Sequence, residues 1–441
     1  MRKLLTGAAL CALIAGQAGA ASDPALLGAW RLDDGRIFTL SPSADDSWRY
    51  RFVDDGSSGR LYPRATGSWS GGAGFNEREP IVLQATSVGP DGLRWQRADA
   101  ATQVAQRIPV RERELALDAG GVRLHARLVW PTTPGPHPLV VLVHGSERSA
   151  AVGAWYEPYQ LAAHGIAALV YDKRGTGRSQ GSFSANFALL AQDAAAAARL
   201  AAAQPEIDPK RIGFAGFSQG GWVAPLAAEQ FGSARAVLVG YGSVHSPLHE
   251  DRFQCLFDLR AAGADAEALA EADALVSAAH TLLLTGLKEG WALFQQRAER
   301  VAQRPWFKQL DEKRCIAAGF AAYPAWVLRM FAPSRLPPGI DWNYDSEALL
   351  TRLKLPMLWQ LAQEDREAPA QDTAATLQRL AKAGKPYEVQ MFPLTDHGIL
   401  RYQEQNGVRI PTGYDPAYFR SALAFWQRQF KTSVASAAPS P

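Results

Sequence analysis

A serine held between two glycines is the first feature of the sequence that could do chemistry. Residues 216–220 read Gly-Phe-Ser-Gln-Gly, and they follow the apolar run RIGFA and precede a segment of helical composition. In a sharp strand-to-helix turn the serine hydroxyl is exposed at the carboxyl edge of a sheet, and flanking glycines allow the close backbone contacts of such a turn. We therefore expect Gly216 and Gly220 to shape the turn and Ser218 to be a nucleophile.

A serine hydroxyl is a weak nucleophile at neutral pH, so it needs a base, and the base needs a carboxylate that orients it. The chain has eight histidines, and only His397, in FPLTDHG, lies in a loop after the expected acid-bearing strand. We expect His397 to be the base. The other seven lie before the core, at its turns, or at and within a helical insertion: His125, His137, His144, His164, His245, His249 and His280.

The acid is expected at the end of the apolar run PMLWQLAQED. Asp365 is the last residue of this run, so the chain order of the three groups is Ser, Asp, His. A carboxylate directly beside the base is badly placed to orient it, which argues against Asp396. The other acids that remain as alternatives are Glu364, Asp341 and Asp345.

An oxyanion site is expected at the end of an earlier strand. The run PLVVLVHGS ends in His144, Gly145 and Ser146. The backbone N–H of Ser146 can join that of Gln219 to hold a developing negative charge. We expect His144 and Gly145 to be structural residues of this turn.

The elements that position these residues alternate between strands and helices. Continuous apolar runs, such as PLVVLVHGS, IAALVYDKRG, RIGFAGFS, RAVLVGYGS and PMLWQLAQED, are typical of parallel strands buried on both faces. The stretches FALLAQDAAAAARLAAA and PAQDTAATLQRLAKAG between them are typical of helices. The pattern predicts an α/β fold, with helices on both faces of a mostly parallel sheet.

Two further segments flank or interrupt this pattern. Residues 21–110 contain short strand-like runs separated by turns such as DDG and GPDG, which predicts a small β-sandwich or barrel. Its four tryptophans either fill its core or line a carbohydrate or lipid surface, and we expect the core. Residues 245–350 have helical texture and many aromatic residues, so we expect a cap over one end of the sheet, with most of its rings in its own core.

These segments define the expected organisation of the chain. It comprises a signal peptide (1–20), a β-domain (21–110), the first part of the α/β core (111–244), a helical cap (245–350), the second part of the core (351–430) and a flexible tail (431–441).

The first twenty residues have a basic start, a short apolar stretch and an Ala-Gly-Ala ending, which is typical of a secretory signal peptide. We expect cleavage after about Ala20 and a periplasmic or secreted protein without a membrane span. Two cysteines, Cys255 and Cys315, remain in the mature chain, and a disulfide between them is plausible in an oxidising compartment. Two buried thiols are the alternative.

Charge and motifs argue against several kinds of partner. Without Arg2 and Lys3 of the expected signal peptide, 44 basic residues stand against 43 acidic residues, so nothing suggests nucleic acid. The sequence has no clustered metal ligands and no phosphate-loop GK[ST] motif. We expect neither a metal nor an organic cofactor, and composition says nothing of the oligomeric state.

Together these motifs resemble those of an α/β-hydrolase-fold serine hydrolase. The resemblance covers most of residues 113–430 apart from the cap, and it rests on HGS at 144–146, YDKRGTGRS at 171–179, GFSQGG at 216–221, Asp365, and DHG at 396–398. The turn DKRGTGRS is similar to one in the serine aminopeptidase and acyl-hydrolase branches of this fold. Similar proteins usually carry a glycine shortly before the acid, whereas this chain has LAQED, which keeps Glu364 as an alternative. The dehalogenase and epoxide hydrolase branches carry aspartate where this chain has Ser218.

The expected reaction is acyl transfer to water through an acyl-enzyme on Ser218. The aromatic cap favours an apolar group, so a carboxylic ester is the first expected substrate. An exopeptidase or thioesterase on the same triad is the alternative. An exopeptidase would need carboxylates that face the pocket, for which the cap offers Asp251, Glu271 and Asp341. A binding protein with a silent hydrolase fold is the non-enzyme alternative, although such a protein has no need of all three groups.

Overall fold

The structure is a computed structural model that describes residues 26–431 except 44, 45, 73, 76, 335 and 407. The expected signal peptide (1–20), and all of the expected tail except Lys431, lie outside the described residues. None of the helices described has the length and apolar character needed to cross a membrane.

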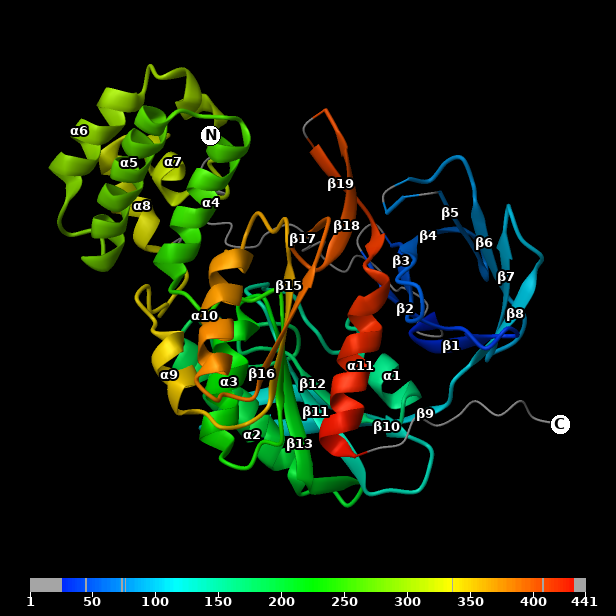
Figure 1. Ribbon diagram of the computed structural model, residues 1–441. Helices are drawn as coiled ribbons and strands as arrows, with labels where there is room; N and C mark the ends of the chain where they lie inside the picture. Colours follow the sequence, from blue (N-terminus) through cyan, green and yellow to red (C-terminus); the bar gives the residue numbers. More distant parts are fainter. Residues whose placement is uncertain are drawn as a thin grey trace.

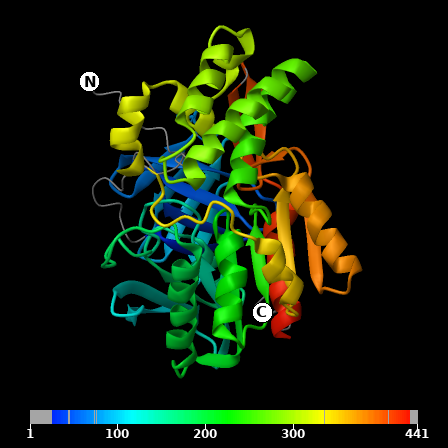
Figure 2. The ribbon, with the colours of Figure 1, turned by 90° about the vertical axis from the view of Figure 1, so that its left-hand side faces the viewer.

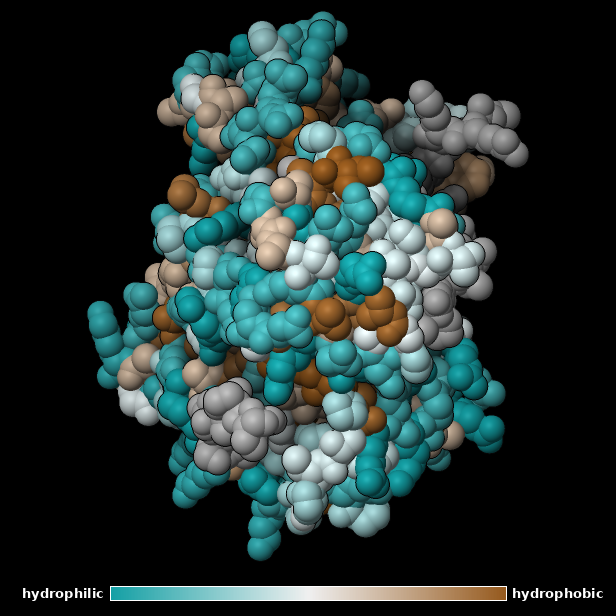
Figure 3. Space-filling model, turned by 90° about the vertical axis from the view of Figure 1, so that its right-hand side faces the viewer, coloured by the Kyte–Doolittle hydropathy of each residue, from teal (hydrophilic) through white to brown (hydrophobic). Residues whose placement is uncertain are grey.

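The N-terminal unit is a closed barrel of eight antiparallel strands, seen on the right of Figure 1. Its strands are β1 (Gly28–Leu32), β2 (Ile37–Pro42), β3 (Trp48–Phe52), β4 (Ser58–Ala65), β5 (Ser68–Gly71), β6 (Leu83–Ser87), β7 (Gly92–Arg97) and β8 (Gln103–Arg107). The barrel core contains the four tryptophans Trp30, Trp48, Trp69 and Trp95. They therefore fill the interior and do not form a binding surface. The face of the molecule on this side is mainly hydrophilic, with scattered hydrophobic patches (Figure 3).

The second unit is built on an eight-stranded sheet with the order β16-β15-β14-β13-β11-β12-β10-β9. Its strands are β9 (Val110–Asp118), β10 (Arg123–Pro131), β11 (His137–Val143), β12 (Ala167–Tyr171), β13 (Ile207–Phe217), β14 (Val237–Gly240), β15 (Met357–Ala362) and β16 (Tyr387–Phe392). Neighbours from β12 to β16 are parallel, and β9 and β10 are antiparallel additions at one edge. The central strands are buried along their whole length, because helices cover both faces. This architecture confirms the predicted α/β-hydrolase fold.

Helices cover the two faces of the sheet in unequal numbers (Figures 1 and 2). One face carries α2 (Phe187–Ala202), α3 (Gly220–Phe231), α9 (Ser346–Arg352) and α10 (Ala370–Lys382), and the other carries α1 (Glu157–Ala163) and α11 (Pro416–Phe430). The alanines on the buried side of α2 are fully enclosed, so this helix packs closely against the sheet and α3. Residues 346–350, expected in the cap, belong to α9, since Leu349 and Leu350 are buried in the sheet core.

A separate group of helices lies above the sheet (Figure 2). This cap consists of α4 (Pro247–Ala261), α5 (Ala266–Leu284), α6 (Trp291–Val301), η2 (Pro305–Gln309), α7 (Ile316–Ala321), α8 (Ala325–Phe331) and η3 (Ala332–Ser334). It has a hydrophobic core of its own, which buries Trp291, Phe294, Trp306 and Phe320. Trp326, by contrast, is 64% exposed on α8.

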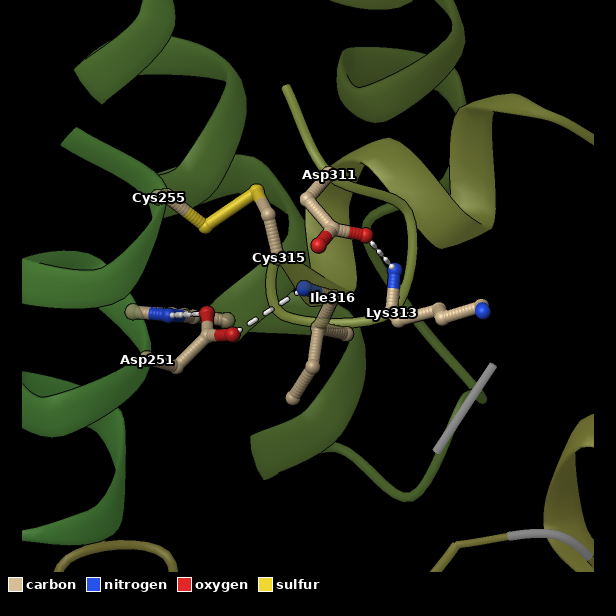
Figure 4. The surroundings of a disulfide bond; sticks show 7 residues. Asp251, Cys255, Asp311, Lys313, Cys315 and Ile316 are labelled. Atoms are coloured by element: carbon tan, nitrogen blue, oxygen red, sulfur yellow. Dashed lines mark hydrogen bonds and ion pairs between the residues drawn. A yellow bond between two sulfur atoms is a disulfide. The ribbon is translucent and has the colours of Figure 1, made fainter. Parts of the chain in front are cut away.

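A disulfide joins Cys255 on α4 to Cys315 before α7 (Figure 4). Beside it, the buried carboxylate of Asp251 accepts hydrogen bonds from the backbone N–H of Ile316 (3.0 Å) and from Nε2 of His280 (2.8 Å). The covalent bond and these two contacts hold α4 against the rest of the cap.

Sequence patterns did not predict the small sheet that follows β16. It consists of β17 (Thr395–Asp396), β18 (Leu400–Gln405) and β19 (Val408–Tyr414), and β18 and β19 form an antiparallel hairpin. In Figure 1 this hairpin stands between the cap and the barrel.

Replacing both cysteines, as Cys255→Ser with Cys315→Ser, should lower the free energy of unfolding by about 2–4 kcal/mol, because the bond closes a loop of 60 residues. Denaturant unfolding with and without dithiothreitol measures this effect. The reductant should destabilise the wild type and leave the double variant unchanged. An unchanged wild type in reductant would contradict a stabilising disulfide.

Candidate active site

Ser218 lies in the sharp turn between β13 and α3. Its backbone is left-handed, with φ 53°, and its N–H donates to the carbonyl of Gly240 (3.0 Å). A Cβ on Gly216 would lie 2.2 Å from the carbonyl oxygen of Gly220, and a Cβ on Gly220 would lie 2.9 Å from that of Val143. Neither position can take a side chain, so both glycines act as the sequence predicts for such a turn.

The structure brings Ser218, His397 and Asp365 together. Nε2 of His397 lies 3.1 Å from Oγ of Ser218. Nδ1 of the same ring lies 3.0 Å and 3.2 Å from the two carboxylate oxygens of Asp365. The ring of Tyr241, which follows β14, packs edge-on against the imidazole with 4.9 Å between ring centroids. When the imidazole carries its proton on Nδ1, that N–H donates a hydrogen bond to Asp365. The lone pair of Nε2 then accepts the proton of Ser218.

The Asp365 carboxylate is buried, and its own loop holds it. Its Oδ1 accepts the N–H groups of Glu367 (2.7 Å) and Ala368 (2.9 Å). Burial raises the pKa of Asp365, while the nearby His397 and the N–H of Ala368 oppose the rise. Asp365 is therefore held in the orientation that meets the base.

The rival acids have other contacts. Asp345 caps α9 through the N–H of Ala348, and Asp341 accepts the N–H of Asn343. Asp396 faces Arg409, with 2.9 Å between Oδ2 and Nη1. The backbone N–H of Glu364 donates to the carbonyl of Thr395, two residues before His397, and its own carbonyl accepts from Arg409 on β19.

The loop of residues 144–146 lies directly beside Ser218. A Cβ on Gly145 would lie 3.4 Å from the Cβ of Ser218. The Gly145 carbonyl accepts a hydrogen bond from Nζ of the buried Lys173 (2.8 Å). Because C=O and N–H point in opposite directions across a trans peptide, the N–H of Ser146 points away from Lys173. Gln219 precedes the first turn of α3, where backbone N–H groups have no partner within the helix.

His144 packs beneath this loop. Its Nε2 contacts the carbonyl of Tyr171, and its Nδ1 lies 3.3 Å from Glu147. Burial opposes ionisation of Glu147, yet the hydrogen bond with His144 and the charge of Lys173 hold the pKa of this carboxyl at about 2. The sequence analysis missed Lys173, although it lies inside the DKRGTGRS turn; its long side chain reaches back across 28 residues.

Two further carboxylates lie near the base, and the sequence analysis missed both. Oε2 of Glu367 is 3.6 Å from Nε2 of His397. Glu250, on α4, is 8% exposed, and burial raises its pKa to about 8, with the charge of His397 opposing the rise and those of Asp365 and Glu367 adding to it. Among the described residues, none forms a hydrogen bond or ion pair with the Glu250 side chain.

The cap acids considered from the sequence have other roles. Asp251 is buried against His280, Asp341 is engaged by Asn343, and Glu271 pairs with Arg304 (2.8 Å) and Arg300 (3.2 Å). The neighbouring position on α4, residue 250, carries the carboxylate that lies near the base.

Comparison with known proteins agrees with this fold. The X-Pro dipeptidyl-peptidase (S15 family) model matches residues 120–393, more than half of the chain, and the chain belongs to this family. With the fold, this makes it a serine hydrolase, either a peptidase or an esterase. No curated protein matches the chain.

Many solved structures are similar to the chain at low identity. A hypothetical protein from Pseudomonas aeruginosa is 18% identical, with a TM-score of 0.43, over 73% of this chain and 94% of that one. A Pyrococcus furiosus esterase is 15% identical, with a TM-score of 0.46, over 74% and 92%. The acylaminoacyl peptidase of Pyrococcus horikoshii is 14% identical, with a TM-score of 0.45, over 92% of this chain, which spans 58% of that peptidase.

Asp365→Asn should lower kcat by about 10⁴-fold, because the amide leaves the imidazole in the wrong tautomer. Steady-state hydrolysis of an activated substrate measures this loss, with Glu364→Gln as the matched control. The control should retain most of the activity. A large loss in Glu364→Gln together with an active Asp365→Asn would mean that the acid is misassigned.

Proposed function

We propose that the protein is a serine exopeptidase that cleaves amides, and activated esters, of substrates with a free amino terminus. The nucleophile is Ser218, the base is His397 and the acid is Asp365. The distances from Nε2 of His397 to Oγ of Ser218 (3.1 Å) and from Nδ1 of His397 to Oδ2 of Asp365 (3.0 Å) support these roles. The observation that carries the substrate assignment is the pair of carboxylates, Glu250 and Glu367, beside the base.

The reaction proceeds in two acyl transfers. His397 takes the proton of Ser218 as Oγ attacks the substrate carbonyl, and Asp365 stabilises the imidazolium. The N–H groups of Ser146 and Gln219 hold the oxyanion of the tetrahedral intermediate. The intermediate collapses, the C–N or C–O bond breaks, and the leaving group departs with the proton from His397. Water, deprotonated by His397, then attacks the acyl-enzyme and releases the acid and Ser218.

The two carboxylates determine which acyl group fits. A buried carboxylate without a cationic partner is costly, and an ammonium group offsets that cost through charge and hydrogen bonds. Glu250 is buried and Glu367 is within 3.6 Å of the base, so a cation held by them lies next to the reacting carbonyl. The α-ammonium of an N-terminal residue meets this requirement, since few bonds separate it from the scissile carbonyl. The family name, which refers to a dipeptidyl-peptidase, also supports an exopeptidase.

The carboxylic ester expected from the sequence is the second candidate. The same triad attacks esters, and the aromatic rings of the cap still favour apolar groups. Aminoacyl esters satisfy both requirements, whereas simple acyl esters have no ammonium group for Glu250 to bind.

We also propose that the protein is exported to the periplasm or beyond. The signal-like composition of residues 1–20 and the disulfide between Cys255 and Cys315 support this location.

Export is tested by intact-mass measurement of the protein recovered outside the cytoplasm of an expressing bacterium. We expect the mass of a chain that begins at Ala21. A full-length mass, or protein confined to the cytoplasm, would contradict the proposal.

The substrate assignment is tested with matched nitroanilides that differ only in their amino terminus. Aminoacyl and dipeptidyl nitroanilides with a free amino group should turn over, while their N-acetylated forms and nitrophenyl acyl esters should show at least about tenfold lower kcat/KM. Ser218→Ala is the control for all of them. Preference for acyl esters over every free-amino substrate would make the enzyme an esterase.

Glu250→Gln should raise KM for the free-amino substrates about 10- to 100-fold, because a charged hydrogen bond to the ammonium is lost. Its effect on the N-acetylated forms should be small. The exposed Glu299 on α6 provides a matched control, Glu299→Gln, which should leave KM unchanged. An unaltered KM in Glu250→Gln would remove Glu250 from the subsite.

The same variant should be more stable than the wild type at pH 8. The folded pKa of Glu250, about 8, lies above its ordinary value of 4.5, so its contribution to stability is complete below pH 4.5 and declines as pH rises towards 8. A glutamine at this position does not titrate, so the variant avoids this loss in the free energy of unfolding, which is roughly 3–5 kcal/mol. Tm measured from pH 5 to pH 8 should show a growing advantage of Glu250→Gln, and a constant difference would contradict the shifted pKa.

A further inference from the structure

Asp396, beside the base, joins the loops that carry the acid and the base. Its Oδ1 accepts the backbone N–H of His397 (2.9 Å) and that of Arg366 (3.0 Å). Arg366 directly follows Asp365. One oxygen atom therefore ties together two backbone segments that are 31 residues apart in the chain, on either side of the contact between Asp365 and His397.

Arg409, on the unpredicted hairpin, completes this junction. Its Nη1 lies 2.9 Å from Oδ2 of Asp396 and donates to the carbonyl of Glu364 (2.6 Å). Glu364 directly precedes Asp365, so Arg409 contacts the acid loop on one side and Asp396 on the other. The Tyr402 ring of the same hairpin supports the guanidinium, which lies 4.1 Å from its centroid.

These contacts are shielded from water. The side chains of Arg409 and Asp396 are 11% and 21% exposed, respectively, in contrast to the surface pair of Arg428 and Glu388, at 53% and 51%. Charge-assisted hydrogen bonds are stronger in such surroundings than at an exposed surface, where an ion pair contributes little. The junction is therefore suited to hold the two loops at a fixed separation.

The barrel supports the base of the hairpin. Gly413 of β19 forms a β-bridge with Ser57, and the N–H of Tyr414 donates to the carbonyl of Gly56 (2.9 Å). The hairpin is thus attached to the β-domain at one end and to the acid and base loops through Arg409.

We propose that Arg409 and Asp396 are positioning residues that set the geometry of Asp365 and His397 for proton transfer. This role rests on the proposed triad. Neither side chain needs to contact the substrate, because both act through the loops. Misplacement of a catalytic group by about 1 Å costs on the order of 10²-fold in rate, so loss of the junction should affect the chemical step.

The test compares Arg409→Gln, Asp396→Asn and the double variant on a free-amino nitroanilide. We expect each single variant to lower kcat about 10- to 100-fold with KM changed by less than about threefold. The double variant should be no worse than the poorer single variant, because both remove the same junction. Arg409→Lys, which retains the charge and one donor, should recover part of kcat.

Arg401→Gln is the matched control. The backbone of Arg401 pairs with Thr395, but its side chain pairs with Asp415 (3.1 Å) and not with Asp396 or Glu364, so replacing this side chain should leave kcat unchanged. An equal loss of kcat in Arg401→Gln would mean that general damage to the hairpin explains the effect and would overturn the proposal. The proposal would also be overturned if folded Arg409→Gln had the kcat of the wild type. It would be overturned as well if the losses of kcat in the two single variants multiplied in the double variant.

Two further comparisons keep the outcomes distinct. If Arg409→Gln fails to fold, Asp396→Asn and Arg409→Lys carry the test, since both retain hydrogen-bonding groups at the junction. If the wild type does not hydrolyse the nitroanilide, or Ser218→Ala retains full activity, the result contradicts the proposed triad. If the wild type is active, Ser218→Ala is inactive and Arg409→Gln matches the wild type, only the positioning role has failed.

Discussion

The left-handed backbone of Ser218 is the constraint on which the rest of the site depends. A residue with a side chain in this conformation costs on the order of 1–3 kcal/mol, and it persists only where its surroundings enforce it. The N–H of Ser218 is held by Gly240, and its carbonyl accepts the N–H of Gly221 at 2.7 Å. Because β13 lies in the centre of the sheet, the loops after β11 and β14 end beside the serine. Residues 144–146 and Tyr241 come from these two loops.

The second feature that defines the site is a buried carboxyl group whose ionised form is disfavoured by burial. Asp365 has His397 and two backbone donors, but Glu250 is buried on a cap helix and has no ion-pair or hydrogen-bond partner for its side chain among the described residues. The disulfide at Cys255 and the contacts of Asp251 hold that helix in place, five residues and one residue away from Glu250, respectively. The cap therefore presents a carboxylate to the space near the base at a cost in stability. Such a cost is expected at a functional site.

Motifs in the sequence were enough to predict the sheet, the sharp turn at Ser218 and the three side chains that the structure brings together. Each depends on local chemistry: apolar runs for buried strands, glycines for the turn, and chain order for the acid and the base. The residues that were missed have no local signal. Lys173 contacts the carbonyl of Gly145, 28 residues earlier in the chain, and Arg409 contacts that of Glu364, 45 residues earlier. The sequence could not place the cap acids for the same reason, because the arginines that pair with Glu271 are about 30 residues away.

The most direct test of the account is covalent labelling of the folded protein with a fluorophosphonate, followed by peptide mapping. Such a probe reacts with a serine only where a base activates it and donors hold the oxyanion. We predict one adduct per chain, on Ser218, that is lost when the protein is unfolded before the probe is added. Folded protein that stays unlabelled at Ser218, or that carries its adduct on another serine, would contradict the assignment of the nucleophile.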